Sequence, residues 1–175
     1  FVGTWMHNAY VDMDGEKMSK SLGNVRTVRE LLEQYSGETL RFALLSAHYR
    51  SPLNFSKDLL DSAQSTLDSF YLALRNTADV DADACNIEQT PVFDALCDDL
   101  NTPLAIAELH KLAKALNKAS GDEREKIKSA LLAGGFALGI FNADPSDWFS
   151  DTGADGLAES VIAELLGERA HAKAN

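Results

Sequence analysis

Apolar residues between positions 57 and 77 recur every three or four residues, and this spacing constrains the fold more than any other feature of the chain. They are Leu59, Leu60, Ala63, Leu67, Phe70, Tyr71 and Leu74. On a helix with 3.6 residues per turn these side chains form one stripe. Ser56 can cap the first turn of that helix. The spacing therefore predicts a long amphipathic helix over 57–77 that buries one face against other helices.

Helix-start signals recur at short intervals after position 78. Pro91 predicts a short helix over 91–99, and Asn101-Thr102-Pro103 predicts one that runs to about position 119. Ser120 with Glu123 matches a capping box for a helix through position 132, the glycines that follow predict a loose stretch, and a last helix is expected over 155–172. Short links favour antiparallel neighbours, so we expect an antiparallel helical bundle over 56–175.

Residues 1–55 read as a small mixed segment. Alternation over 9–13 predicts a strand, followed by a loop over 14–24. Thr27 and Glu30 match a capping box that opens a helix to about position 35. A second helix is expected over about 37–47, and Pro52 bars its continuation. The expected fold class is therefore mainly α: a small α/β part and then the helical bundle.

Charge is distributed unevenly along the 175 residues. The net charge is −11, yet residues 1–57 carry seven Lys/Arg against six Asp/Glu, whereas 58–175 carry nine against twenty-one. This disfavours non-specific binding of nucleic acid by the whole surface, but a local basic patch could still select a polyanion. No apolar run approaches the roughly 20 residues that span a membrane, and no signal peptide is recognisable. We expect a cytoplasmic protein.

Cysteine and histidine are too few or too scattered to build a stapled fold or a metal site. Cys85 and Cys97 are expected to be small buried residues in a reducing compartment. The four histidines do not stand at metal-ligand spacing with a cysteine, so no metal site is expected in this chain.

The stretch Lys17-Met18-Ser19-Lys20-Ser21 is the one that most directly indicates chemistry. It places two lysines three residues apart on a glycine-flanked segment between a strand and a helix. Ammonium groups can neutralise a polyphosphate, hydroxyl and backbone N–H groups can fit around its oxygens, and lysines can follow charge onto a leaving group. The spacing differs from that of the Walker phosphate loop.

This stretch resembles the KMSKS signature of class I aminoacyl-tRNA synthetases. Three further stretches are similar to cysteinyl-tRNA synthetases: Trp5-Met6-His7-Asn8, the run from Ser46 to Ser56, and Asp98-Asp99-Leu100-Asn101-Thr102-Pro103. The resemblance extends over nearly the whole chain and is therefore highly specific.

The resemblance implies an enzyme that joins cysteine to ATP, releases pyrophosphate and passes cysteine to the terminal ribose of tRNA. Lys17 and Lys20 would be catalytic, and Lys20 is favoured for direct contact with ATP, which binds with Mg²⁺ as a substrate. Met18, Ser19 and Ser21 would complete the ATP-binding loop. Residues 1–55 would be the end of the catalytic domain with its stem-contact segment, and 56–175 a DALR-like tRNA-binding bundle, cut short at its C-terminus.

Other parts implied by the resemblance are expected outside this chain. The family has a Rossmann-type domain with a His-Ile-Gly-His type signature and zinc ligands that select cysteine, both upstream. Its small anticodon-reading domain would lie beyond position 175. The chain is therefore expected to hold one half of an active site and to be inactive alone.

Several residues outside the signature admit two interpretations. Arg50 could bind a backbone phosphate of tRNA or cap the end of the preceding helix. Lys111, Lys114 and Lys118 share one helical face, which is either a solvated basic face or a contact to the tRNA backbone; Arg124, Lys126 and Lys128 follow on the next helix.

Simple structural roles are expected for three further groups. His7 is expected to be a structural histidine. Trp5, Trp148 and Phe149 are expected to pack, and Asp98 and Asp99 to complement the helix start that follows them.

Two alternatives to a cysteine–tRNA ligase remain open at this stage. The cysteine ligase of mycothiol synthesis resembles the same family but uses an amino-sugar inositol as its acceptor, so it needs no tRNA surface. A non-catalytic module that binds tRNA or a protein would have little need for Lys17 and Lys20. The runs around Ser21 and Arg50 favour the synthetase over the first alternative.

Overall fold

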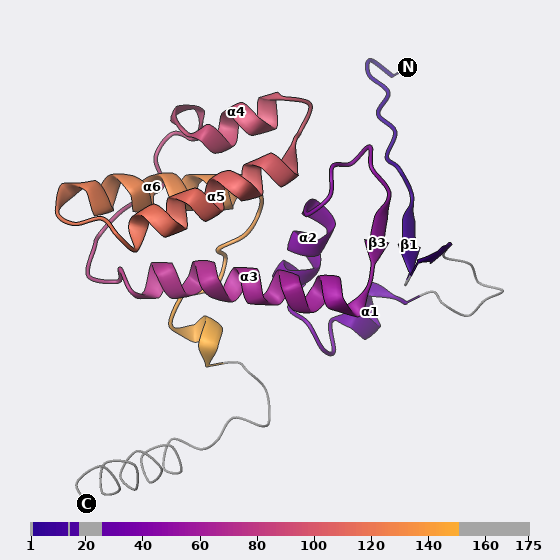
Figure 1. Cartoon of the computed structure of the whole chain (residues 1–175), viewed down its shortest axis with the longest axis horizontal. Coiled ribbons are helices and arrows are strands. Elements are labelled where there is room, and N and C mark those ends of the chain that lie inside the picture. Colours follow the sequence, from indigo (N-terminus) through magenta and orange to yellow (C-terminus); the bar gives the residue numbers. More distant parts are fainter. Residues whose placement is uncertain (1, 14, 18–25, 151–175) are drawn as a thin grey trace, which may run out of the picture.

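The computed structural model describes residues 2–13, 15–17 and 26–150. Its elements are β1 (Val11–Met13), β2 (Glu16–Lys17), α1 (Val28–Leu31), α2 (Gly37–Leu45), β3 (Leu53–Phe55), α3 (Lys57–Arg75), η2 (Ile87–Gln89), α4 (Pro91–Cys97), α5 (Thr102–Leu116), α6 (Asp122–Ala137) and η3 (Asp147–Phe149). A small sheet stands at one end of an elongated set of helices (Figure 1). The predicted fold class is confirmed.

Helix α3 runs along the length of the molecule (Figure 1), and its apolar stripe is buried as the sequence predicts. The Ser56 hydroxyl accepts a hydrogen bond from the Leu59 amide at 3.2 Å, which caps the helix. Leu67 and Phe70 are fully buried on the stripe, and Leu59 is half-buried at its start. The helix ends at Arg75, two residues earlier than expected. The chain turns after the helix, and the Thr77 hydroxyl donates a hydrogen bond to the Ala73 carbonyl at 2.9 Å.

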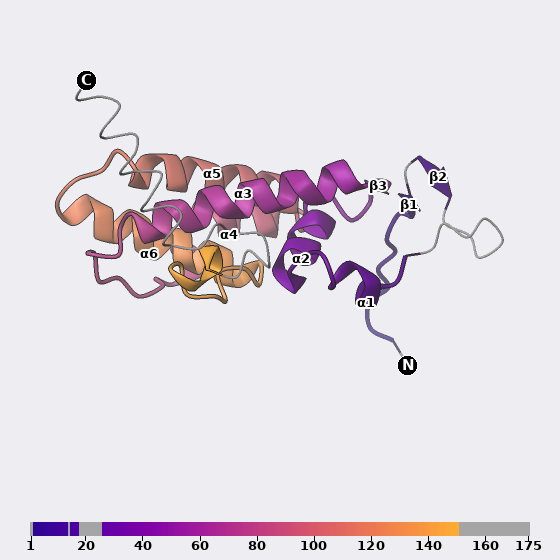
Figure 2. The ribbon, with the colours of Figure 1, turned by 90° about the horizontal axis from the view of Figure 1, so that it is seen from below.

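Helix α5 packs against α3, and α4 and α6 pack against α5, so that the four helices form the bundle. Neighbours that are joined by short links, α4 with α5 and α5 with α6, run antiparallel, whereas α3 and α5 run in the same direction (Figures 1 and 2). The chain achieves this because residues 76–101, with α4, return it to the other end of the bundle. Pro91 and Asn101 begin α4 and α5 as expected.

Helix α6 departs from two sequence expectations. Ser120 and Glu123 form no capping box, because Gly121, with φ of +60°, takes the N-cap position and no side chain caps the helix. The predicted loose stretch is instead helical through Gly134 and Gly135. A Cβ at Gly135 would lie 2.0 Å from Phe141 Cδ2, and one at Gly134 would lie 2.7 Å from Val92 Cγ2. The glycines allow close packing rather than disorder of the backbone.

The sheet has the order β2-β1-β3, with β1 antiparallel to β2 and parallel to β3. Strand β3 is absent from the sequence prediction, and β2 occupies two positions that were expected to be loop. Strand β1 is two residues shorter than the alternation over 9–13 predicts. The capping box of Thr27 with Glu30 is confirmed, but α1 ends at Leu31 rather than near position 35.

Buried residues from both parts of the chain form one continuous core. Met13, Leu40 and Phe55 belong to the same cluster as Leu60 and Leu67. Because packing is continuous across position 55, the structure does not separate residues 1–55 from 56–175. The boundary between these two domains stays a prediction. The helix predicted over 155–172 lies outside the described residues. Among the described helices, none is both long and apolar enough to cross a membrane.

Candidate functional site

The lysine signature starts from the edge strand of the sheet. Lys17 ends β2, and its backbone is the register partner of Asp12 on β1. Gly15, at φ of +84°, makes the turn between the two strands, a backbone region that glycine adopts without steric cost. Met18, Ser19, Lys20 and Ser21 lie outside the described residues. The structure thus places the start of the signature and the strands that carry it.

The segment that ends in β3 holds β1 along its length. The Ala9 amide donates to the Tyr49 carbonyl at 2.8 Å, and the Leu53 amide donates to the Tyr10 carbonyl at 3.1 Å. At the far end, the side-chain oxygen of Asn54 accepts a hydrogen bond from the Gly15 amide at 2.9 Å. These contacts make residues 49–54 the support on which the β1–β2 turn rests.

Four residues join this support to the helical bundle, and we call them the Asp99 cluster: His48, Tyr49, Arg50 and Asp99. The Tyr49 hydroxyl donates to Asp99 Oδ1 at 2.7 Å, and Arg50 Nε lies 2.8 Å from Asp99 Oδ2. His48 Nε2 lies 3.0 Å from the Asp99 carbonyl oxygen. The hydrogen bond from Tyr49, followed by that from Arg50, holds the pKa of Asp99 below its ordinary value of 3.8.

The Asp99 cluster corrects two expectations. Arg50 does not cap the end of α2, because its guanidinium turns to Asp99 on the turn between α4 and α5. Asp99 is not simply complementary to the start of α5, because its carboxylate accepts hydrogen bonds from residues about 50 positions earlier. Neither partner could be inferred from local spacing.

The basic residues near the turn between α5 and α6 divide into two groups. Lys111, Lys114, Lys118 and Lys126 are exposed, and Lys111 Nζ lies 2.7 Å from Glu108 Oε1. By contrast, Arg124 forms two hydrogen bonds with the Asp79 carboxylate, at 2.9 and 3.1 Å.

Lys128 also binds the turn that follows α3. Its Nζ donates to the carbonyls of Thr77 and Val80, at 3.0 and 2.6 Å. Arg124 and Lys128 are therefore engaged in holding residues 76–80.

Two of the three aromatic residues that were expected to pack do so. Trp148 stacks on Tyr71 with ring centroids 4.1 Å apart, and its Nε1 donates to Asp68 at 2.8 Å. Phe149 is half-buried, with the Arg75 guanidinium 4.2 Å from its ring centroid.

The expectation for Trp5 is wrong, since 71% of its surface is exposed and no described element covers residues 2–8. His7 is exposed for the same reason and stacks on Trp5.

Neither cysteine is buried as expected. Cys97 is exposed at the last position of α4, and Cys85 is half-buried; both thiols are free. Within the described residues, no group of three or more His, Cys, Asp or Glu side chains could hold a metal ion.

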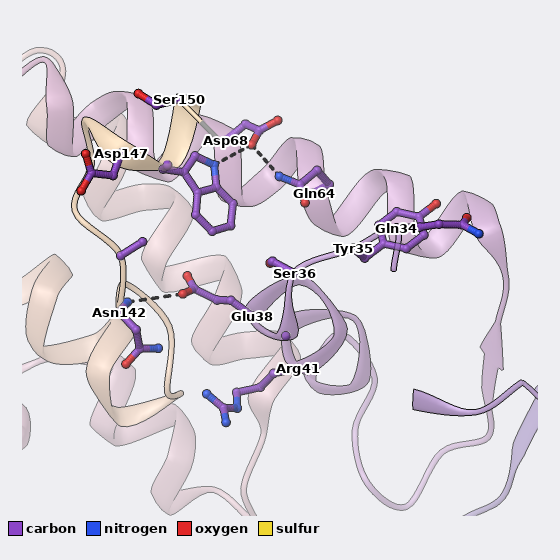
Figure 3. Close-up of a pocket in the computed structure, with 13 residues that line it drawn as sticks. Gln34, Tyr35, Ser36, Glu38, Arg41, Gln64, Asp68, Asn142, Asp147 and Ser150 are labelled. Atoms are coloured by element: carbon purple, nitrogen blue, oxygen red, sulfur yellow. Dashed lines mark hydrogen bonds between the residues drawn. The ribbon is translucent and has the colours of Figure 1, made fainter. Parts of the chain in front are cut away.

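An open groove of about 1070 Å³ lies between α2, α3 and η3 (Figure 3). Sequence reasoning missed it, because its walls come from segments a hundred residues apart. Two of its three carboxylates have partners: Glu38 accepts from the Asn142 amide at 3.3 Å, and Asp68 accepts from Gln64 and Trp148. None of the residues predicted to be functional lines this groove.

Comparison with family models finds two matches along the chain. Residues 1–65 match the model of the class I (C) tRNA synthetase catalytic domain, and residues 92–142 match the DALR domain. A catalytic segment that carries the lysine signature, followed by a DALR helical domain, defines a class I aminoacyl-tRNA synthetase.

Relatives identify the particular member of this class. Proteins named cysteine–tRNA ligase from Saccharophagus degradans, Paramagnetospirillum magneticum and Xanthomonas campestris are 51%, 49% and 46% identical to the chain, each over 99% of it. The chain belongs to the cysteine–tRNA ligase family. It spans 38%, 38% and 37%, respectively, of the length of these relatives.

Proposed function

We propose that this chain is the part of a cysteine–tRNA ligase that binds the phosphates of ATP and holds tRNA. The whole protein joins cysteine to ATP as cysteinyl-adenylate, releases pyrophosphate, and then transfers cysteine to the terminal ribose of its tRNA. One observation carries the proposal: an uninterrupted lysine signature follows the β1–β2 turn in a chain that matches cysteine–tRNA ligases over nearly all its length.

The role of the signature follows from its position at the edge of the sheet. Lys17 ends the edge strand β2, so the signature begins at the last described position of that strand. In this proposal Lys17 and Lys20 neutralise the triphosphate, which binds with Mg²⁺, and stabilise the charge that builds up on the departing pyrophosphate. Lys20 makes the direct contact. Met18, Ser19 and Ser21 shape the loop around the phosphate oxygens.

Binding of tRNA uses the end of the bundle that lies away from the sheet. The turn between α5 and α6, where Lys118 lies, and the sheet stand at opposite ends of α3 (Figures 1 and 2). The 19 residues of α3 span about 28 Å. A duplex carries roughly 16 phosphate charges over that length. A long polyanion can therefore reach Lys111, Lys114 and Lys118 while its end lies near the signature.

Arg50 is a weaker candidate for tRNA contact, because Asp99 already neutralises it. The zinc ion that the family uses to select cysteine would be held by residues outside this chain. Because its substrates are cysteine, ATP and tRNA, we place the protein in the cytoplasm.

Charging of tRNA with labelled cysteine tests the proposal. We expect charging by the full-length protein but none by this segment alone, and we expect the substitution Lys20→Ala to abolish it. Charging by the segment alone would show that the active site lies elsewhere. Activation of cysteine without charging of tRNA would instead favour a ligase with a small-molecule acceptor.

A further inference from the structure

The turn between α4 and α5 has an unusual backbone at the point where it meets the α2–β3 loop. Asp99 and Leu100 have φ of +53° and +55°, a region that aspartate tolerates and leucine rarely adopts. Two backbone hydrogen bonds keep this conformation and close the end of α4: Leu100 to Leu96 at 3.1 Å, and Asn101 to Ala95 at 3.2 Å. The left-handed turn aims the Asp99 side chain at Tyr49 and Arg50.

A continuous chain of contacts leads from this turn to the lysine signature. Asp99 holds Tyr49 through its hydroxyl, and the Tyr49 carbonyl accepts the Ala9 amide at 2.8 Å. Ala9 leads into β1, which pairs with β2, and β2 ends at Lys17. A second contact runs alongside, since the Thr102 hydroxyl lies 3.4 Å from the Ala47 carbonyl.

Exposure separates this arrangement from an ordinary stabilising ion pair. The side chains of Arg50 and Asp99 are 65% and 50% exposed. Exposed pairs contribute little to the free energy of unfolding, because water screens them. Stability alone therefore gives little reason for a strained turn at this place.

We propose that Asp99 is a positioning residue: by holding Tyr49 and Arg50 it fixes the loop that supports β1, and so couples the helical bundle to the strands that carry the lysine signature. The inference rests on the proposed function for its link to catalysis. In this arrangement, a ligand that shifts α4 and α5 also shifts the base of the ATP-binding loop.

The test compares two substitutions in the full-length protein. Asp99→Ala removes the cluster, whereas Asp79→Ala removes an exposed carboxylate that pairs with Arg124 at the far end of the bundle. Asp99→Asn keeps an acceptor for Tyr49 and tolerates the left-handed backbone, so it serves as the conservative variant and replaces Asp99→Ala if that protein fails to fold.

Two readouts are used: cysteine-dependent exchange of labelled pyrophosphate into ATP, and hydrogen–deuterium exchange of the amides of residues 9–13. We expect Asp99→Ala to lower kcat/KM for ATP at least threefold while the KM for cysteine is unchanged. We also expect its 9–13 amides to exchange at least threefold faster. Asp79→Ala should match the wild type in both readouts, and Asp99→Asn should be intermediate.

Equal behaviour of Asp99→Ala and Asp79→Ala in both readouts would overturn the inference. Absence of pyrophosphate exchange in the wild-type protein would contradict the proposed function instead. In that case the amide exchange of residues 9–13 still decides whether Asp99 positions β1.

Discussion

The carboxylate of Glu38 accepts a hydrogen bond of 2.9 Å from the backbone amide of Phe141, which lies 103 residues later in the chain. The same carboxylate accepts the Tyr71 hydroxyl at 2.9 Å. Phe141 has φ of +67°, and its ring packs edge-on against Tyr71. One acidic side chain at the start of α2 thereby fixes α3 and the turn that follows α6. The catalytic segment and the bundle are joined through this point as well as through Asp99.

Replacing Glu38 should destabilise the fold. We expect Glu38→Ala to lower the free energy of unfolding by about 1–3 kcal/mol, because the buried Tyr71 hydroxyl and the backbone amides of Phe141 and Asn142 lose their acceptor. Glu38→Gln keeps one acceptor oxygen and should lose less. Urea denaturation measures both. A loss below about 0.5 kcal/mol for Glu38→Ala, the range of ordinary surface changes, would contradict this role.

The glycine pair in α6 provides a second stability test. Alanine favours helix over glycine by about 0.5–1 kcal/mol, yet Gly135→Ala should destabilise, because its Cβ would lie 2.0 Å from Phe141 Cδ2. Overpacking of this kind costs about 1–3 kcal/mol. Gly37→Ala is the matched control, since the nearest atom to its Cβ would be Leu32 Cδ2 at 3.8 Å. Thermal unfolding should show a lower Tm for the first variant only; equal Tm values would mean that α6 packs differently.

Asp79 should make the free energy of unfolding depend on pH in the acidic range. The hydrogen bonds from Arg124 lower the pKa of Asp79 below its ordinary value of 3.8. A depressed carboxyl pKa stabilises the fold above the unfolded value, and this contribution is lost as the pH falls through the folded value. The difference in stability between the wild type and Asp79→Asn should therefore be constant near neutral pH and shrink below about pH 3.8. A difference that grows on acidification would refute the assignment.

The exposed lysines on α5 should govern the salt dependence of tRNA binding. Reversal of Lys111, Lys114 and Lys118 to glutamate is expected to weaken binding at low salt. It should also reduce the slope of log affinity against log salt by about 2–3, the value for three lost phosphate contacts. Filter binding at several salt concentrations measures the slope. Unchanged affinity at low salt would show that these lysines form a solvated basic face and do not contact tRNA.

Sequence pattern predicts the helices well where one segment carries its own signals. The apolar stripe and Ser56 locate α3, and Asn101 locates the start of α5, because caps and periodicity act within a few residues. Strand β3 is missed, because three residues after Pro52 are too few to show alternation. Ser120 misleads, since Gly121 adopts the N-cap conformation more readily.

In the candidate site too, sequence pattern predicts features made by neighbouring residues and misses contacts between residues far apart in the chain. The lysine signature is contiguous, so it can be found in the sequence alone, and its role stays a prediction. The partners of Arg50 and Glu38 lie about 50 and 100 residues away, and no local spacing encodes such pairs. In the sequence, the glycines of α6 resemble helix-breaking residues. Their packing role is hidden because the side chains that lie against them, Val92 and Phe141, come from other segments.

Cysteine-dependent exchange of pyrophosphate into ATP by the full-length protein tests the central claim most directly. We expect the wild-type protein to exchange and Lys20→Ala to lose at least a hundredfold of kcat/KM for ATP, because a charge contact to the leaving pyrophosphate is removed. Lys57→Ala is the control: this lysine is exposed at the first position of α3, where a cation is slightly unfavourable, so its removal should leave exchange unchanged. Equal exchange by Lys20→Ala and Lys57→Ala would contradict the account.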